Sequence, residues 1–138
     1  MSQREFRILF VDDESDIRDV FNTLVLGELS ARYKIESMSV ENGNEAEKLF
    51  ATGNRFDVVV CDYQMPGKNG LEVFRSVVKM QPDVAFILFS GVINKYNELL
   101  YENELKPENL YLCFDKNWNL LREMIKTIFE DMRDLTFP

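Results

Sequence analysis

Apolar and polar positions change their spacing several times along the 138 residues of the chain. Four runs rich in Val, Ile, Leu and Phe predict buried strands, because strands covered on both faces of a parallel sheet lose polar alternation. These runs span residues 6–11, 56–61, 84–89 and 110–114. A fifth segment, residues 33–40, alternates more and carries Lys34 and Glu36, which favours a strand at the edge of the sheet.

Apolar residues recur every three or four positions between these runs, which is typical of helices with one buried face. The expected helices cover residues 17–29, 45–51, 71–80, 93–105 and 120–129. This spacing places Leu24 on the buried face of the first helix and Leu120 on that of the last. Gly53 and Pro82 follow the second and third helices, where such residues commonly end a helix.

Strict alternation of strand and helix predicts an α/β fold, with five parallel strands joined by right-handed crossovers and helices on both faces. We find no linker rich in Ser, Gly or Pro and no repeat in the sequence. We therefore expect one domain over residues 1–138, with no second domain in the chain.

Charge and composition limit the classes of binding partner and of active site that the chain can have. The formal net charge is −8, and nucleic acids or anionic membranes would require a basic face, so we expect to find neither bound directly. The chain contains no histidine, which excludes histidine-based acid–base catalysis and most zinc sites. No apolar run approaches the roughly 20 residues that span a bilayer, and the first residues do not resemble a signal peptide. We therefore expect a cytoplasmic location.

Two cysteines, Cys61 and Cys113, each lie inside an apolar run. Free cysteine behaves as a small buried hydrophobe in many proteins, and disulfides are rare in the cytosol. We expect both to be reduced thiols in the core rather than redox sensors.

Polar residues follow four of the expected strands: Asp12 and Asp13 after the first, then Asp62, Ser90 and Lys116. Open parallel sheets bind ligands beyond the carboxyl ends of their strands, so these side chains converge if the first strand is central. Three neighbouring carboxylates need a cation or a proton between them, and carboxylate oxygens suit Mg²⁺. A carboxylate can also attack phosphorus, while a hydroxyl and a lysine neutralise phosphoryl oxygens. Taken alone, Asp12 and Asp13 would equally suit a helix start.

The combined motifs resemble the receiver domain of two-component response regulators. The likeness covers essentially the whole chain, and the segment Asp-x-x-Met-Pro-x-x-x-Gly is its most specific part. The residues that carry it are Val11-Asp12-Asp13-Glu14, Asp62-Tyr63-Gln64-Met65-Pro66-Gly67-Lys68-Asn69-Gly70-Leu71, Phe89-Ser90-Gly91 and Lys116. The resemblance implies a flavodoxin-like sheet with strand order 2-1-3-4-5.

The resemblance also implies a role for each site residue. Asp62 would accept the phosphoryl group, and Asp12, Asp13 and the backbone carbonyl of Gln64 would hold Mg²⁺ together with it. Ser90 would bond a phosphoryl oxygen. Lys116 would pair with Asp62 and then with its phosphate.

The expected function is phosphorylation-dependent signalling, in which the only reactions catalysed are the domain's own phosphorylation and dephosphorylation. A histidine kinase or phosphotransfer protein would be the donor. The phosphorylated domain would bind a downstream protein partner or relay the phosphate, as a monomer or weak homodimer.

Two positions depart from the family pattern and one residue differs beside the phosphosite. The family usually has proline after the lysine, often in a cis peptide, where this chain has Asn117. Cis bonds without proline cost roughly 2.5–4 kcal/mol, so we expect a trans bond with a shifted loop or a strained cis bond. Cys113 occupies the position of the usual aromatic switch, which puts the usual coupling in doubt. Gln64 could change the lifetime of the acyl phosphate.

Three alternatives stay open. A hydrolase with an aspartyl nucleophile, like the haloacid-dehalogenase-like phosphatases, would need an Asp-x-Asp pattern that Asp12-Asp13-Glu14 lacks. A receiver-like binding module independent of phosphorylation would agree with Cys113 and Asn117. The chain could also be one domain of a larger protein.

Overall fold

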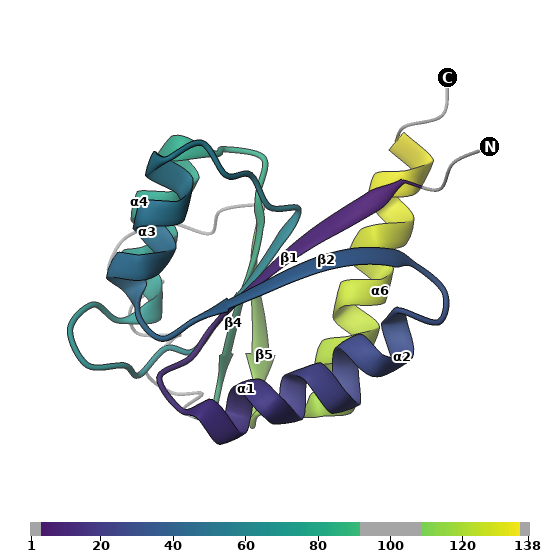
Figure 1. Cartoon of the computed structure of the whole chain (residues 1–138), viewed down its shortest axis with the longest axis horizontal. Coiled ribbons are helices and arrows are strands. Elements are labelled where there is room, and N and C mark those ends of the chain that lie inside the picture. Colours follow the sequence, from purple (N-terminus) through teal and green to yellow (C-terminus); the bar gives the residue numbers. More distant parts are fainter. Residues whose placement is uncertain (1–3, 92–108, 136–138) are drawn as a thin grey trace.

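The computed structural model describes residues 4–91 and 109–135, so the expected helix at 93–105 lies outside the described residues (Figure 1). The strands are β1 (Glu5–Val11), β2 (Lys34–Val40), β3 (Val58–Cys61), β4 (Ala85–Ser90) and β5 (Leu110–Phe114). The helical segments are α1 (Ser15–Phe21), the π-helix η1 (Asn22–Leu26), α2 (Gly27–Leu29), α3 (Gly43–Ala51), α4 (Gly70–Met80) and α6 (Trp118–Leu135).

The five strands form one sheet in the order β2-β1-β3-β4-β5, and every neighbouring pair is parallel. The predicted fold class, strand order and edge position of β2 are therefore confirmed. The register pairs Val11 with Cys61, and Cys61 with Leu88. The residues that follow β1 and β3 consequently lie side by side at the carboxyl ends of the strands, near the end of β4.

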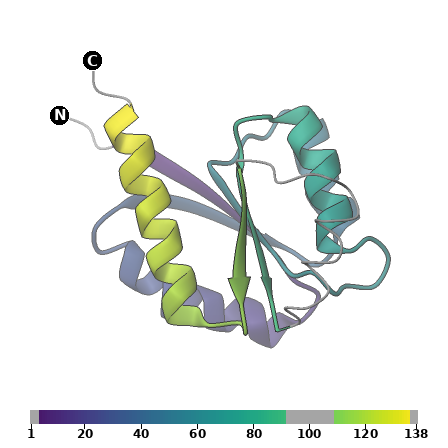
Figure 2. The same cartoon turned by 180° about the vertical axis from the view of Figure 1, so that it is seen from behind.

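Helices cover both faces of the sheet (Figures 1 and 2). Alternate residues of β1 point to opposite faces, so Phe6 and Phe10 pack beneath α1, η1, α2 and α6, while Leu9 packs beneath α3 and α4. The Phe6 ring stacks on Phe129 of α6 with a centroid distance of 4.1 Å, and Phe10 stacks on Phe21 of α1 at 4.2 Å. These contacts fix the helices around a site at the carboxyl ends of the strands.

The structure corrects two expected core positions. Leu24 is 45% exposed and Leu120 is 43% exposed, although both were expected on buried helix faces. Leu24 lies in η1, where the π-helical turn adds a residue to the repeat and rotates the following positions, so that Val25 and Leu26 are buried instead. Leu120 lies in the first turn of α6, where the adjacent Leu121 is buried.

Several element boundaries differ from the expectation by a few residues, the largest difference being at α6, which ends at Leu135 rather than at residue 129. Helix α3 begins at Gly43, where Asn42 caps it by accepting a hydrogen bond from the backbone N–H of Glu45. Strand β3 begins at Val58, yet the Phe56 ring is buried against Phe50. The Gln81 side chain satisfies the Phe56 backbone, accepting from its N–H at 3.0 Å and donating to its carbonyl at 2.6 Å. Among the helices of the described residues, none is both long and apolar enough to cross a membrane.

Candidate functional site

Three carboxylates meet at the carboxyl ends of β1 and β3. Asp12, Asp13 and Asp62 each offer an oxygen within 4.8 Å of the others. Asp12 is 0% exposed and Asp62 6% exposed, whereas Asp13 is open to solvent. The expected convergence of these residues is therefore observed, with one carboxylate at the mouth and two inside.

Lys116 supplies the positive charge opposite these acids. Its Nζ lies 3.7 Å from Oδ2 of Asp12 and 3.7 Å from Oδ2 of Asp62. Asp12 Oδ1 accepts the backbone N–H of Glu14 at 3.0 Å, but its buried Oδ2 has no hydrogen-bond partner among the described residues. The ammonium thus sits between two carboxylates, at ion-pair distance from each, and one buried oxygen stays without a hydrogen bond.

Burial and crowding shift the acidity of the two inner carboxylates. Burial raises the pKa of Asp62 to about 6, which Lys116 opposes and the neighbouring Asp12 reinforces. Burial also raises the pKa of Asp12, against the lowering effects of the Glu14 N–H and Lys116. One lysine therefore does not compensate the carboxylates gathered here.

Two further predicted site residues, Ser90 and Gln64, lie at the same carboxyl end of the sheet. Ser90 ends β4 and is buried. Gln64 is exposed on the loop after Asp62, and its backbone N–H donates a hydrogen bond to the Asp62 carboxylate. All six predicted residues thus belong to segments that meet at the carboxyl end of the sheet.

Comparisons with known proteins address the family. Residues 8–102 match the sequence model of the response regulator receiver domain. This chain belongs to that family. The receiver domain is 29% identical over 112 residues to the two-component response regulator ORR42 of rice, covering 81% of this chain and 79% of that protein. It is 27% identical to the response regulator SaeR of Staphylococcus aureus over 94% of this chain, but spans only 57% of SaeR.

Solved structures give the same result. The response regulator TrrA of Thermotoga maritima, solved in complex with Mg²⁺ and beryllium fluoride, is 33% identical with a TM-score of 0.67, covering 89% of this chain and 98% of that one. A receiver domain protein from Clostridium thermocellum is 26% identical with a TM-score of 0.73, covering 95% and 99%. The chain is therefore a response regulator receiver domain of two-component systems, a family of signalling proteins rather than metabolic enzymes.

The acidic cluster of this receiver domain fits Mg²⁺ binding. Mg²⁺ prefers oxygen ligands and keeps several waters, so a half-open group of carboxylates suits it. Asp12 Oδ2, which is buried and has no hydrogen-bond partner in the described part of the chain, and the exposed Asp13 provide such a group. A divalent cation would also offset the repulsion between carboxylates that adds to burial in raising the pKa values of Asp12 and Asp62.

The loop after β5 resolves the question raised by Asn117. Within the described residues no peptide bond is cis, so the Lys116–Asn117 bond is trans. Two residues before this trans bond have left-handed backbone conformations, Asp115 at φ 61° and Lys116 at φ 46°. Such conformations cost non-glycine residues roughly 1–3 kcal/mol each. Asn117 then caps α6, its Oδ1 accepting the N–H of Leu120 at 3.0 Å.

The loop after β3 is held in place by contacts that its motif predicts only in part. The Gly70 N–H donates to the Tyr63 carbonyl at 2.9 Å, and Asn69 forms a capping box with Glu72. A Cβ on Gly70 would lie 2.5 Å from the Asp62 carbonyl oxygen, which explains the glycine. Lys68 reaches across to Glu47 of α3 at 2.5 Å.

Sequence reasoning missed Arg18 of α1. Its guanidinium donates to the Asp12 backbone carbonyl at 2.6 Å and lies 3.7 Å from the Glu41 carboxylate. It thereby fixes the backbone that carries Asp12 and adds positive charge beside the acidic cluster. Its place one helical turn after Asp13–Glu14 was the available signal.

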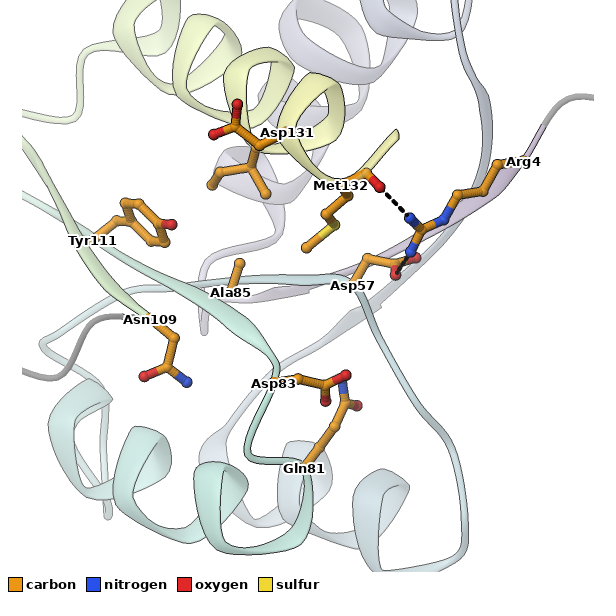
Figure 3. A pocket seen from close by; sticks show the side chains of 10 residues that line it. Arg4, Asp57, Gln81, Asp83, Ala85, Asn109, Tyr111, Asp131 and Met132 are labelled. Atoms are coloured by element: carbon orange, nitrogen blue, oxygen red, sulfur yellow. Dashed lines mark hydrogen bonds and ion pairs between the residues drawn. The ribbon is translucent and has the colours of Figure 1, made fainter. Parts of the chain in front are cut away.

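A larger cavity of about 500 Å³ lies at the opposite end of the sheet, between α6 and the start of β4 and β5 (Figure 3). Several of its polar groups bond to one another or to nearby backbone carbonyls. Arg4 donates to Asp57 at 3.0 Å and to the Met132 carbonyl at 3.1 Å, while Asn109 donates to the carbonyls of Pro82 and Val84. These bonds link the residues just before β1, β3, β4 and β5, and Arg4 also reaches α6. Among the described residues, no set of reactive groups converges in this cavity as it does at Asp62.

Proposed function

We propose that this receiver domain is phosphorylated on Asp62 and signals through that modification. The observation that carries the proposal is the environment of Asp62, which is buried at the end of a central strand with a lysine and two further carboxylates around it. A carboxylate in this setting is a nucleophile toward phosphorus. The donor would be the phosphohistidine of a histidine kinase or phosphotransfer protein.

In the transfer step, an Asp62 carboxylate oxygen attacks phosphorus as the bond from phosphorus to the donor's imidazole nitrogen breaks. The new bond is the acyl phosphate, and the imidazole leaves with the electron pair. Lys116 would turn from the carboxylates to the phosphoryl oxygens, and the Ser90 hydroxyl would donate to one of them. The charge added at Asp62 then requires a new arrangement of both residues.

Asp12, Asp13, Asp62 and the backbone carbonyl of Gln64 would hold Mg²⁺. When bound, the ion supplies positive charge that offsets the negative charge of the transferring phosphoryl group. The complex of the similar TrrA with Mg²⁺ and beryllium fluoride supports this assignment. Asp12 and Asp13 keep the site anionic enough to retain the ion, while Arg18 positions the Asp12 backbone.

We further propose that the receiver domain extends over residues 1–138 and acts in the cytoplasm as a monomer or weak homodimer. Its output would be a contact with a downstream protein or relay of the phosphate. The net charge of −8 supports a protein partner over direct contact with nucleic acid or membrane.

A second candidate function is a receiver-like binding module that works without phosphate. The observation in its favour is that Cys113 in β5 and Asn117 in the loop after β5 replace the usual aromatic and proline residues. The cysteine is buried and its pKa is raised to about 11 by that burial, so it is a neutral core residue.

Intact-mass spectrometry separates these functions. With acetyl phosphate and Mg²⁺, we expect the wild-type protein to gain one phosphoryl group, and Asp62→Asn to gain none. Asp57→Asn is the matched control, because Asp57 lies at the opposite end of β3 and should leave the mass gain intact. No gain in the wild type at saturating donor would favour the binding module, and turnover of a free phosphomonoester would favour a hydrolase.

A further inference from the structure

The position three residues before Lys116, where the family usually has an aromatic residue, has none in this chain. Cys113 occupies that position and is fully buried in the core, paired in register with Phe89 of β4. A small buried thiol lacks the ring that would swing inward or outward at an exposed edge. The conformational signal therefore needs another route out of the site.

Trp118 offers that route. It is the single tryptophan of the chain and the first residue of α6, and it is only partly buried. Its ring packs on Phe89 with a centroid distance of 4.8 Å and an interplanar angle of 55°. This contact joins the end of β4 to the start of α6.

Each ring of this pair is tethered to one of the two groups assigned to the phosphoryl oxygens. Phe89 directly precedes Ser90, and Trp118 follows Lys116 by two residues. A displacement of Ser90 or Lys116 toward a phosphoryl group must therefore be absorbed by the backbone next to one ring. Close-packed interiors transmit such displacements rather than dissipating them.

The segment from Asp115 to Trp118 contains two backbone positions that are unfavourable for residues other than glycine. Asp115 and Lys116 both have left-handed backbone conformations, which non-glycine residues rarely adopt and which persist only while their surroundings hold them. The lysine Nζ is 3.7 Å from each of two carboxylates, beyond hydrogen-bond distance. Lys116 can thus take a new partner without breaking a hydrogen bond to either acid.

We propose that the Phe89–Trp118 contact transmits phosphorylation of Asp62 to α6, with Trp118 as a positioning residue for the loop that carries Lys116. This proposal rests on the proposed function. Movement of Ser90 and Lys116 to the phosphoryl oxygens repacks the two rings and shifts the first turn of α6. The exposed start of α6 thereby reports the state of Asp62.

Intrinsic fluorescence tests the first step, because all tryptophan emission comes from Trp118. On adding acetyl phosphate to the Mg²⁺-loaded protein, the emission should change with the same time course as the mass gain in the same sample. Mg²⁺ alone and Asp62→Asn with acetyl phosphate are the controls that should lack this phase. Complete phosphorylation by mass without a change in emission would overturn the proposal, whereas no mass gain would instead contradict the proposed function.

Hydrogen–deuterium exchange of peptides covering residues 118–125 tests the second step. Phosphorylation should alter exchange in the wild type and in Trp118→Phe, which keeps a ring, but much less in Phe89→Leu and Trp118→Leu. Phe129→Leu is the matched control, since it removes a buried ring stacked on Phe6 farther along α6 and should retain the response. An undiminished response in phosphorylated Phe89→Leu and Trp118→Leu would overturn the proposal.

Discussion

At the scale of single residues, Asp62 is where the site lowers the stability of the fold most clearly. A carboxylate that is 6% exposed beside Asp12 loses hydration and gains repulsion, and one lysine at 3.7 Å offsets these effects only partly. The folded protein therefore binds a proton at Asp62 more tightly than the unfolded chain does. A buried carboxylate that is suited to a reaction in this way lowers the stability of the folded protein while no ligand or phosphoryl group is bound.

This imbalance predicts a pH-dependent stability in metal-free protein. The pKa of Asp62 is about 6 when folded against a reference of 3.8, so stability falls as pH rises through that interval. At pH 7 with EDTA, Asp62→Asn should be more stable than the wild type by about 1–3 kcal/mol in urea unfolding. Near pH 4 the two proteins should differ little, because the wild-type carboxyl is then largely protonated. A constant difference from pH 4 to 7 would contradict this account.

At the scale of elements, the site depends on the close approach of α4 to the loop after β3. Gly70 begins α4, and its N–H bonds the Tyr63 carbonyl at 2.9 Å. Its missing side chain leaves space for the Asp62 carbonyl and the Leu88 side chain, which would lie 2.5 and 2.6 Å from a Cβ. The glycine is therefore required by packing around the phosphoacceptor rather than by an unusual φ.

Gly70→Ala should accordingly damage both stability and chemistry. We expect a loss of about 1–3 kcal/mol in unfolding free energy from overpacking, and slower phosphorylation because the Asp62 loop must move. Gly91→Ala is the control, since a Cβ there meets no atom of the described residues within 4 Å. Urea unfolding and the rate of mass gain measure the two effects, and equal behaviour of the two variants would refute the packing argument.

The elements also show which features of the fold and the site can be predicted from the sequence. Apolar runs ending in Asp12, Asp62 and Ser90 were sufficient for the strands, because strand burial follows from local pattern. The convergence of the site also required the strand order, which came from the resemblance to receiver domains. The π-helical turn that exposes Leu24 was not predictable, since one added residue in a helical repeat leaves no compositional mark. The contact of Arg18 with the Asp12 carbonyl depends on how the chain turns between β1 and α1, which residue spacing does not determine.

At the scale of the whole molecule, the sheet and α6 are held together at the end of the sheet far from Asp62. Arg4 joins β1 to Asp57, just before β3, and to the Met132 carbonyl near the end of α6 (Figure 3). Its guanidinium also lies 5.0 Å from the Phe6 ring centroid. A single side chain thus connects the first strand, a central strand and the last helix.

Arg4→Ala should therefore weaken the fold at this end without altering phosphorylation. The Arg4–Asp57 pair is partly sheltered, with side-chain exposures of 34% and 22%, and with the carbonyl bond we expect a loss of about 1–2 kcal/mol in urea unfolding. Arg55→Ala is the matched control: its pair with Asp83 is 66% and 73% exposed and should contribute less than about 0.5 kcal/mol. Because Met132 lies in the last turn of α6, Arg4→Ala should also speed amide exchange there while the rate of mass gain stays unchanged. Equal losses in the two variants would show that solvent, rather than this three-way contact, governs both ion pairs.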